Sequence, residues 1–308
     1  MKKIIYFYWI FFVILIATII YFFNTFSLEI LKQLTPQIAI LVLLFILSPI
    51  FLSIFNMKLI IKDMGYETSY SKLFYIIRSS MFVEHTAPLK ISIPLRIYLY
   101  KKFQKIPITV GTAASTIELL LTLFVPAIIS IFAIKAIFTE YNITIPIVAV
   151  LLILLVFFII IFGFNVRLFK KPSYKFINKL EDIKERFQKS IKKLSIFTVI
   201  TFTIITLLIF MFSAIRVGII LSIFDTPQLG IIKILYAFTL AFLIGGLSFI
   251  PAGLGVRDAS LTFLLIQLSV PAEIAIATTL IERILTMAIS IILGVYSITM
   301  LGLKHENV

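Results

Sequence analysis

Residues 249–260 read FIPAGLGVRDAS: an apolar run meets a proline and two glycines, and an arginine and an aspartate follow. A charged side chain inside a bilayer costs free energy and usually faces a cavity or a charged partner. Glycines let the backbone approach a ligand closely, and a helix that begins near Asp258 directs its free N–H groups toward the same place. The stretch therefore predicts an interrupted helix that exposes Arg257 to an internal polar cavity.

The composition of the 308-residue chain is that of a membrane protein. Hydrophobic residues make up 61% of it and the mean hydropathy is +1.15, which is more apolar surface than a soluble domain of this size can bury. Several apolar runs reach the roughly 20 residues that a helix needs to cross the hydrocarbon core. The predicted fold class is an all-α, polytopic transmembrane helical bundle.

Several kinds of chemistry are not expected. Cysteine is absent and only two histidines occur, which excludes disulfides and thiolate metal sites and argues against a histidine-rich metal centre. The sequence contains no P-loop, nucleophile elbow or HExxH motif. We therefore expect no catalytic residue of a known soluble enzyme class, no metal site and no cofactor.

The charges between the apolar runs predict the membrane topology. We interpret the net charge of +14 as an excess of Lys and Arg on the cytoplasmic face and not as a nucleic-acid site. The interrupted segments 73–100 and 231–270 then each return to the face they entered from, as re-entrant hairpins from opposite sides. Both chain termini are expected in the cytoplasm, in a multi-pass protein of the cell membrane. The expected spans are 4–23, 36–57, 107–137, 145–165, 196–223 and 273–302, with a polar connection at 58–72.

Residues 166–195 differ from the rest because they contain ten Lys or Arg residues against three acidic ones. Their apolar residues fall on one helical face, which predicts an amphipathic helix on the cytoplasmic membrane surface. A solvated connector between spans is the alternative.

The two interrupted segments resemble each other. HTAPLKISIPLR (85–96) precedes a helix that reads AASTIELLLTL (113–123), and FIPAGLGVRDAS precedes one that reads ATTLIERILTM (277–287). Glu118 and Glu282 correspond in this alignment. We therefore expect one membrane domain, 1–308, with inverted repeats at about 36–137 and 196–302, as in many transporters.

These motifs resemble those of the lysylphosphatidylglycerol synthase/flippase transmembrane domain family, over roughly residues 5–302. PAGLGVRD (251–258) and IER (281–283) are similar to the family's Pro-Gly-Gly-x-Gly-x-Arg-Glu stretch and its following arginine-bearing helix. In the first half, TAPLKISIPLR (86–96) matches in Thr86, Pro88 and Arg96. The chain departs from the family pattern at Leu89, Ser92, Ile93, Ala252 and Asp258.

The candidate binding residues have a functional and a structural interpretation. Arginine suits a lipid phosphate because its planar fork donates paired hydrogen bonds. The structural alternative is that the same charges form ion pairs that hold the hairpins together, with Asp258 capping a helix or holding Arg257. For Arg216 the favoured interpretation is a side chain that extends toward the membrane surface, with a functional role as the alternative. Glu84 and His85 are expected near the first hairpin's tip. The candidate set is Arg96, Glu118, Gly253, Gly255, Arg257, Asp258, Glu282 and Arg283.

The resemblance implies a flippase-like integral membrane protein. We expect a lipid translocase that moves a phospholipid or polyprenyl-phosphate headgroup between leaflets through a central polar cavity. Its partners would be membrane lipids with anionic or phosphate-bearing headgroups, and a synthase or glycosyltransferase is a further candidate partner. The alternative is a membrane-embedded transferase, or an accessory subunit, that acts on a lipid-linked donor.

Overall fold

A computed structural model describes residues 35–86, 91–138, 189–190, 192–224, 229–248 and 250–306. The expected spans 4–23 and 145–165 and nearly all of the basic segment 166–195 lie outside these residues. Within the described parts every regular element is a helix, so the predicted all-α class is confirmed. The elements are α3 (Pro36–Asp63), α4 (Tyr70–Thr86), α5 (Ser92–Gln104), α6 (Ile108–Ile137), α9 (Ile196–Leu221), α10 (Ile231–Leu247), η2 (Pro251–Gly253), α11 (Val256–Gln267) and α12 (Ala272–Glu306).

Four of the described helices, α3, α6, α9 and α12, are long and apolar enough to cross a membrane. They confirm the helices expected at 36–57, 107–137, 196–223 and 273–302. By contrast, α10 has 17 residues and α11 has only 12. A helix of 12 residues covers about 18 Å, so α11 is too short to span a bilayer, as its sequence predicted.

The expected polar connection at 58–72 is wrong at both ends. Helix α3 continues through Lys58 to Asp63, and α4 already begins at Tyr70. The reason is amphipathic packing: Met57, Ile60 and Ile61 are almost fully buried, whereas Lys62 of the same turn is exposed. The apolar face of the helix thus extends past the point where charged residues appear in the sequence.

Helices α3 and α9 begin in the same way and pack along each other. The hydroxyl of Thr35 accepts a hydrogen bond from the backbone N–H of Ile38, and that of Ser195 accepts one from Thr198. Hydroxyl side chains at this position satisfy N–H groups that have no partner within the helix. Each long helix thus has a defined first turn.

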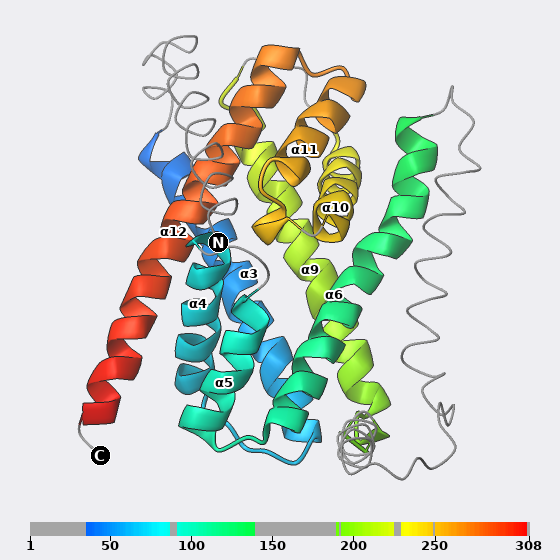
Figure 1. The fold of residues 1–308 in the computed structure, drawn as a ribbon. Coiled ribbons are helices and arrows are strands. Elements are labelled where there is room, and N and C mark those ends of the chain that lie inside the picture. The colour runs from blue at the N-terminus through cyan, green and yellow to red at the C-terminus, as the bar shows by residue number, and fades with distance from the viewer. Residues whose placement is uncertain are drawn as a thin grey trace, which may run out of the picture.

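Each half of the chain contributes a 17-residue helix that packs against a long helix of the other half. Helix α4 of the first half lies against α12 of the second, and α10 of the second lies against α6 of the first. Figure 1 shows the α4–α5 pair joined to its neighbours at the lower end of the bundle and the α10–α11 pair at the upper end. The two short helix pairs therefore enter the bundle from opposite ends.

Candidate functional site

The FIPAGLGVRDAS stretch forms a tight reversal between α10 and α11. Ala252, Gly253 and Gly255 all have positive φ, between 52° and 80°. A carboxylate oxygen of Asp258 accepts a hydrogen bond from the N–H of Gly255, at 3.1 Å, and so caps the start of α11. The capping interpretation of Asp258 is confirmed, and both glycines are needed for backbone conformation.

Arg257 projects from the first turn of α11 toward α12. Its guanidinium donates to both carboxylate oxygens of Glu282, at 3.0 and 3.1 Å, and lies 5.0 Å from the ring centre of Phe238. Gly245 makes this position possible, because a Cβ there would lie 2.6 Å from Cβ of Arg257. Arg257 is therefore paired with Glu282, not with its sequence neighbour Asp258.

Glu282 joins two helices to α12. It is fully buried, and on its other side Arg216 of α9 binds it at 2.5 Å. Arg216 also donates to the backbone carbonyl of Phe45 on α3, at 3.0 Å. The expectation that Arg216 extends to the membrane surface is wrong, because a buried carboxylate offers it a partner inside the bundle.

Arg283, next in sequence, points in a different direction from Glu282. It donates to the backbone carbonyl of Ala252, at 3.0 Å, and lies 3.4 Å from the carboxylate of Asp258. Consecutive helical residues are separated by about 100°, so Glu282 and Arg283 cannot both face the same space. Arg283 therefore ties α12 to the η2 reversal.

The first half of the chain has a simpler charge pair. Arg96 of α5 binds Glu118 of α6 at 2.6 Å and donates from Nε to the hydroxyl of Ser80 on α4, at 3.1 Å. A second arginine, Arg78 on α4, is 4% exposed. Sequence reasoning missed Arg78, although an arginine in an apolar helix is itself a signal for a buried polar site.

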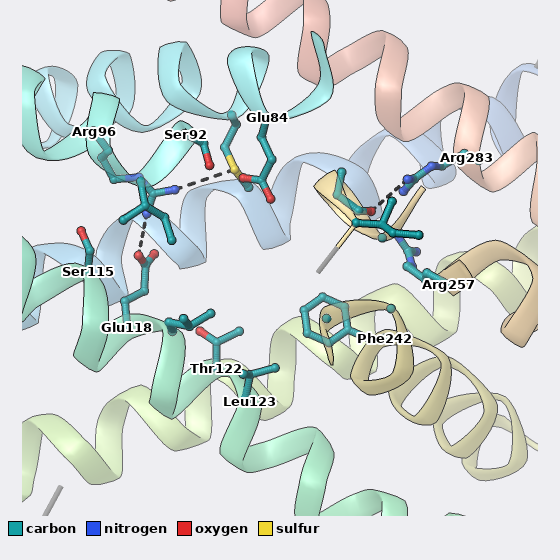
Figure 2. Close-up of a pocket in the computed structure, with 18 residues that line it drawn as sticks. Glu84, Ser92, Arg96, Ser115, Glu118, Thr122, Leu123, Phe242, Arg257 and Arg283 are labelled. Carbon is teal, nitrogen blue, oxygen red and sulfur yellow. Dashed lines mark hydrogen bonds and ion pairs between the residues drawn. The ribbon is translucent and has the colours of Figure 1, made fainter. Parts of the chain in front are cut away.

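A cavity of about 320 Å³ lies between these two groups of charges (Figure 2). Its volume is within the range of about 300–1,000 Å³ that is usual for small-molecule sites. Of the candidate residues, Gly255, Asp258 and Glu282 are not part of its wall. The candidates that do line it are Arg96, Glu118, Gly253, Arg257 and Arg283, and the polar residues that the candidate set omitted are Glu84, Ser92, Ser115 and Thr122.

Several polar atoms at the cavity have no hydrogen-bond partner among the described residues. They are Nε of Arg257 and the hydroxyl of Ser115; Nε of Arg283 also makes no hydrogen bond, but it lies 3.4 Å from a carboxylate oxygen of Asp258. A buried polar group without a hydrogen-bond partner costs free energy, and these atoms have almost no accessible surface. Among the described residues, no three His, Asp or Glu side chains are grouped as a metal site would require.

Fold and site together define an integral, multi-pass α-helical membrane protein with a cavity between its helices that charged and apolar residues line. The chain belongs to the family of the lysylphosphatidylglycerol synthase transmembrane region, whose family model matches residues 8–294. This match confirms the resemblance seen in the sequence motifs. No curated protein and no solved structure matches the chain.

Proposed function

We propose that the protein is a lipid translocase that carries a phosphate-bearing headgroup between leaflets through this cavity. The observation that carries the proposal is the convergence of Arg96, Arg257 and Arg283 on one cavity. These arginines come from α5, α11 and α12, so the site exists only in the folded bundle. In a bilayer, such a concentration of cationic donors favours an anionic group.

The unpartnered atoms support a phosphate in particular. Arg257 binds Glu282 through Nη2 alone, and no described residue accepts a hydrogen bond from its other terminal nitrogen, which leaves that nitrogen for an anion. Phosphate oxygens accept such charge-assisted hydrogen bonds with good geometry. The rest of the cavity wall includes Leu119, Leu123 and Phe242, which suit the apolar part of a lipid near its headgroup.

The arrangement of the helices supports a transport cycle. We infer two inverted repeats, about 36–137 and 196–302, because α4 packs on α12 as α10 packs on α6. The α4–α5 and α10–α11 pairs, which enter the bundle from opposite ends in Figure 1, would then be re-entrant hairpins whose tips meet at the cavity. Rocking of one repeat against the other would open the cavity to each leaflet in turn.

The test is headgroup transfer in proteoliposomes by the Arg257→Ala variant. We expect the transfer rate to fall about tenfold or more, because a hydrogen bond to a charged group contributes about 1.5–3 kcal/mol. Glu282 retains Arg216 as its ion-pair partner in this variant, so the fold should persist. The matched control is Lys233→Ala, which removes one positive charge from the exposed surface of α10.

Unchanged transfer by a folded Arg257→Ala variant would contradict the proposal. The lipid should also be recovered chemically unaltered, as judged by thin-layer chromatography of the vesicle extract. A modified lipid that forms only with the wild-type protein would instead identify a membrane-embedded transferase.

A further inference from the structure

Glu84 differs from the other carboxylates at the site in its ion pairing. It lies near the C-terminal end of α4, is half-buried and lines the cavity. Among the described residues it makes no ion pair and no hydrogen bond through its side chain. The other carboxylates of the site all have an arginine within ion-pair distance: Glu118 has Arg96, Glu282 has Arg216 and Arg257, and Asp258 has Arg283.

The carboxylate of Glu84 also lies in a position that a headgroup would reach. Figure 2 shows it projecting from α4 toward the space between the Arg96–Glu118 pair on one side and Arg257 and Arg283 on the other. Glu84 interacts electrostatically with Arg78 and Arg96 but forms no ion pair with either, so its carboxylate lacks a direct counter-ion when a lipid headgroup fills the cavity and displaces water. A cationic group on the ligand would supply it.

A metal ion is a poor candidate for that counter-charge. Calcium takes six to eight oxygen ligands, and magnesium requires a nearly octahedral set. Among the described residues, the carboxylates in the cavity wall are those of Glu84 and Glu118, and Glu118 is already bound by Arg96 at 2.6 Å. An ammonium group needs fewer oxygen partners than either ion and suits a single carboxylate.

We propose that Glu84 binds the primary ammonium group of a zwitterionic phospholipid headgroup of the phosphoethanolamine type. The phosphate of the same headgroup lies on the arginine side of the cavity, at Arg257 and Arg283. The inference rests on the proposed function in one respect, namely that a lipid headgroup occupies this cavity. It adds a specificity-determining residue and a substrate class: an ammonium beside a phosphate, in preference to a headgroup that is only anionic.

The test measures binding, so it does not depend on transport. Detergent-solubilised full-length protein is mixed with equal amounts of palmitoyl-oleoyl phosphatidylethanolamine and phosphatidylglycerol, and the bound lipids are quantified by native mass spectrometry. We expect the wild type to retain the ethanolamine lipid about tenfold over the glycerol lipid, the ratio that a charge-assisted hydrogen bond provides. In Glu84→Gln the ratio should fall to about one, with phosphatidylglycerol still bound, whereas Glu84→Asp should keep part of the preference.

Glu273→Gln is the matched control, because it removes the same charge from an exposed site in the first turn of α12. It should retain the wild-type ratio, and thermal unfolding should show that both Gln variants are folded. A wild type that binds the two lipids equally, or a Glu84→Gln variant that keeps the preference, would overturn the inference. Neither result bears on whether lipid crosses the membrane, which the Arg257→Ala transfer assay tests separately.

Discussion

Ala252 adopts a backbone conformation that is unfavourable for any residue with a Cβ atom. Its φ of 52° lies in the left-handed region, which costs an L-residue about 1–2 kcal/mol because Cβ approaches the carbonyl oxygen. The surrounding contacts maintain this conformation, since the carbonyl of Ala252 accepts a hydrogen bond from Arg283. The resemblance to the family had already marked this position, where the family pattern has glycine.

We therefore expect Ala252→Gly to stabilise the protein. The free energy of unfolding should rise by about 0.5–1 kcal/mol, because the relief of left-handed strain exceeds the extra entropy of glycine in the unfolded chain. Thermal unfolding in detergent micelles measures the change. Ala259→Gly, on the exposed face of α11, is the control and should destabilise the protein by about 1 kcal/mol. A lower melting temperature for Ala252→Gly would contradict this account of the reversal.

At the scale of elements, glycines allow close contact between α4 and α12 and between α10 and α6. A Cβ at Gly294 of α12 would overlap the Cβ of Phe82 on α4, and a Cβ at Gly246 of α10 would lie 3.3 Å from Leu123 on α6. Small residues at helix contacts in membranes allow close backbone approach and dense van der Waals packing. A glycine therefore allows close helix approach at both the α4–α12 and the α10–α6 contact.

Gly294→Ala should separate α4 from α12. Overpacking typically costs about 1–3 kcal/mol, while the substitution gains about 1 kcal/mol of helix propensity. Gly302→Ala isolates the propensity gain, because nothing lies within 4 Å of a Cβ at that position of the same helix. Gly294→Ala should therefore unfold at a lower temperature than Gly302→Ala. Equal melting temperatures for the two variants would show that α12 can shift freely past Phe82.

At the scale of the whole molecule, buried charge pairs link neighbouring helices that also pack against each other. Arg96–Glu118 joins α5 to α6, and Arg257–Glu282 joins α11 to α12. The cavity lies between these two connections, as Figure 2 shows. Competition between a phosphate and these carboxylates for the arginines would link headgroup binding to movement of the helix pairs.

The proposed re-entrant arrangement predicts which residues share a membrane face. Because the chain contains no cysteine, single-cysteine variants can be labelled without background. We expect Ser71→Cys and Lys105→Cys to react with a membrane-impermeant maleimide only from the cytoplasmic side, and Gly230→Cys and Ser269→Cys only from the other side. All four positions are exposed at the outer ends of the helix pairs. Labelling of Ser71→Cys and Lys105→Cys from opposite sides would mean that α4 and α5 together cross the membrane.

Much of the fold was predictable because membrane spans are determined locally. Hydrophobic length located α3, α6, α9 and α12, and the Pro/Gly break located the reversal before α11. The end of α3 was missed because Lys58 and Lys62 suggested a loop, whereas the burial of the apolar face between them maintains the helix. Charge type also identified most of the cavity arginines, since an arginine in an apolar segment requires an internal partner.

The sequence by itself determined the class of protein, the positions of the described spans and the residue types at the site. Only the tertiary structure decided which charges meet: Arg257 binds Glu282, and Asp258 caps its own helix and approaches Arg283. Glu84 lines the cavity and forms no ion pair with any residue that the structure describes. The physical reason is that a span depends on the apolar length of one segment, whereas an ion pair depends on the rotation and packing of two. Arg216 and Glu282 are 66 residues apart in the sequence, and no local sequence pattern predicts the angle at which their helices pack.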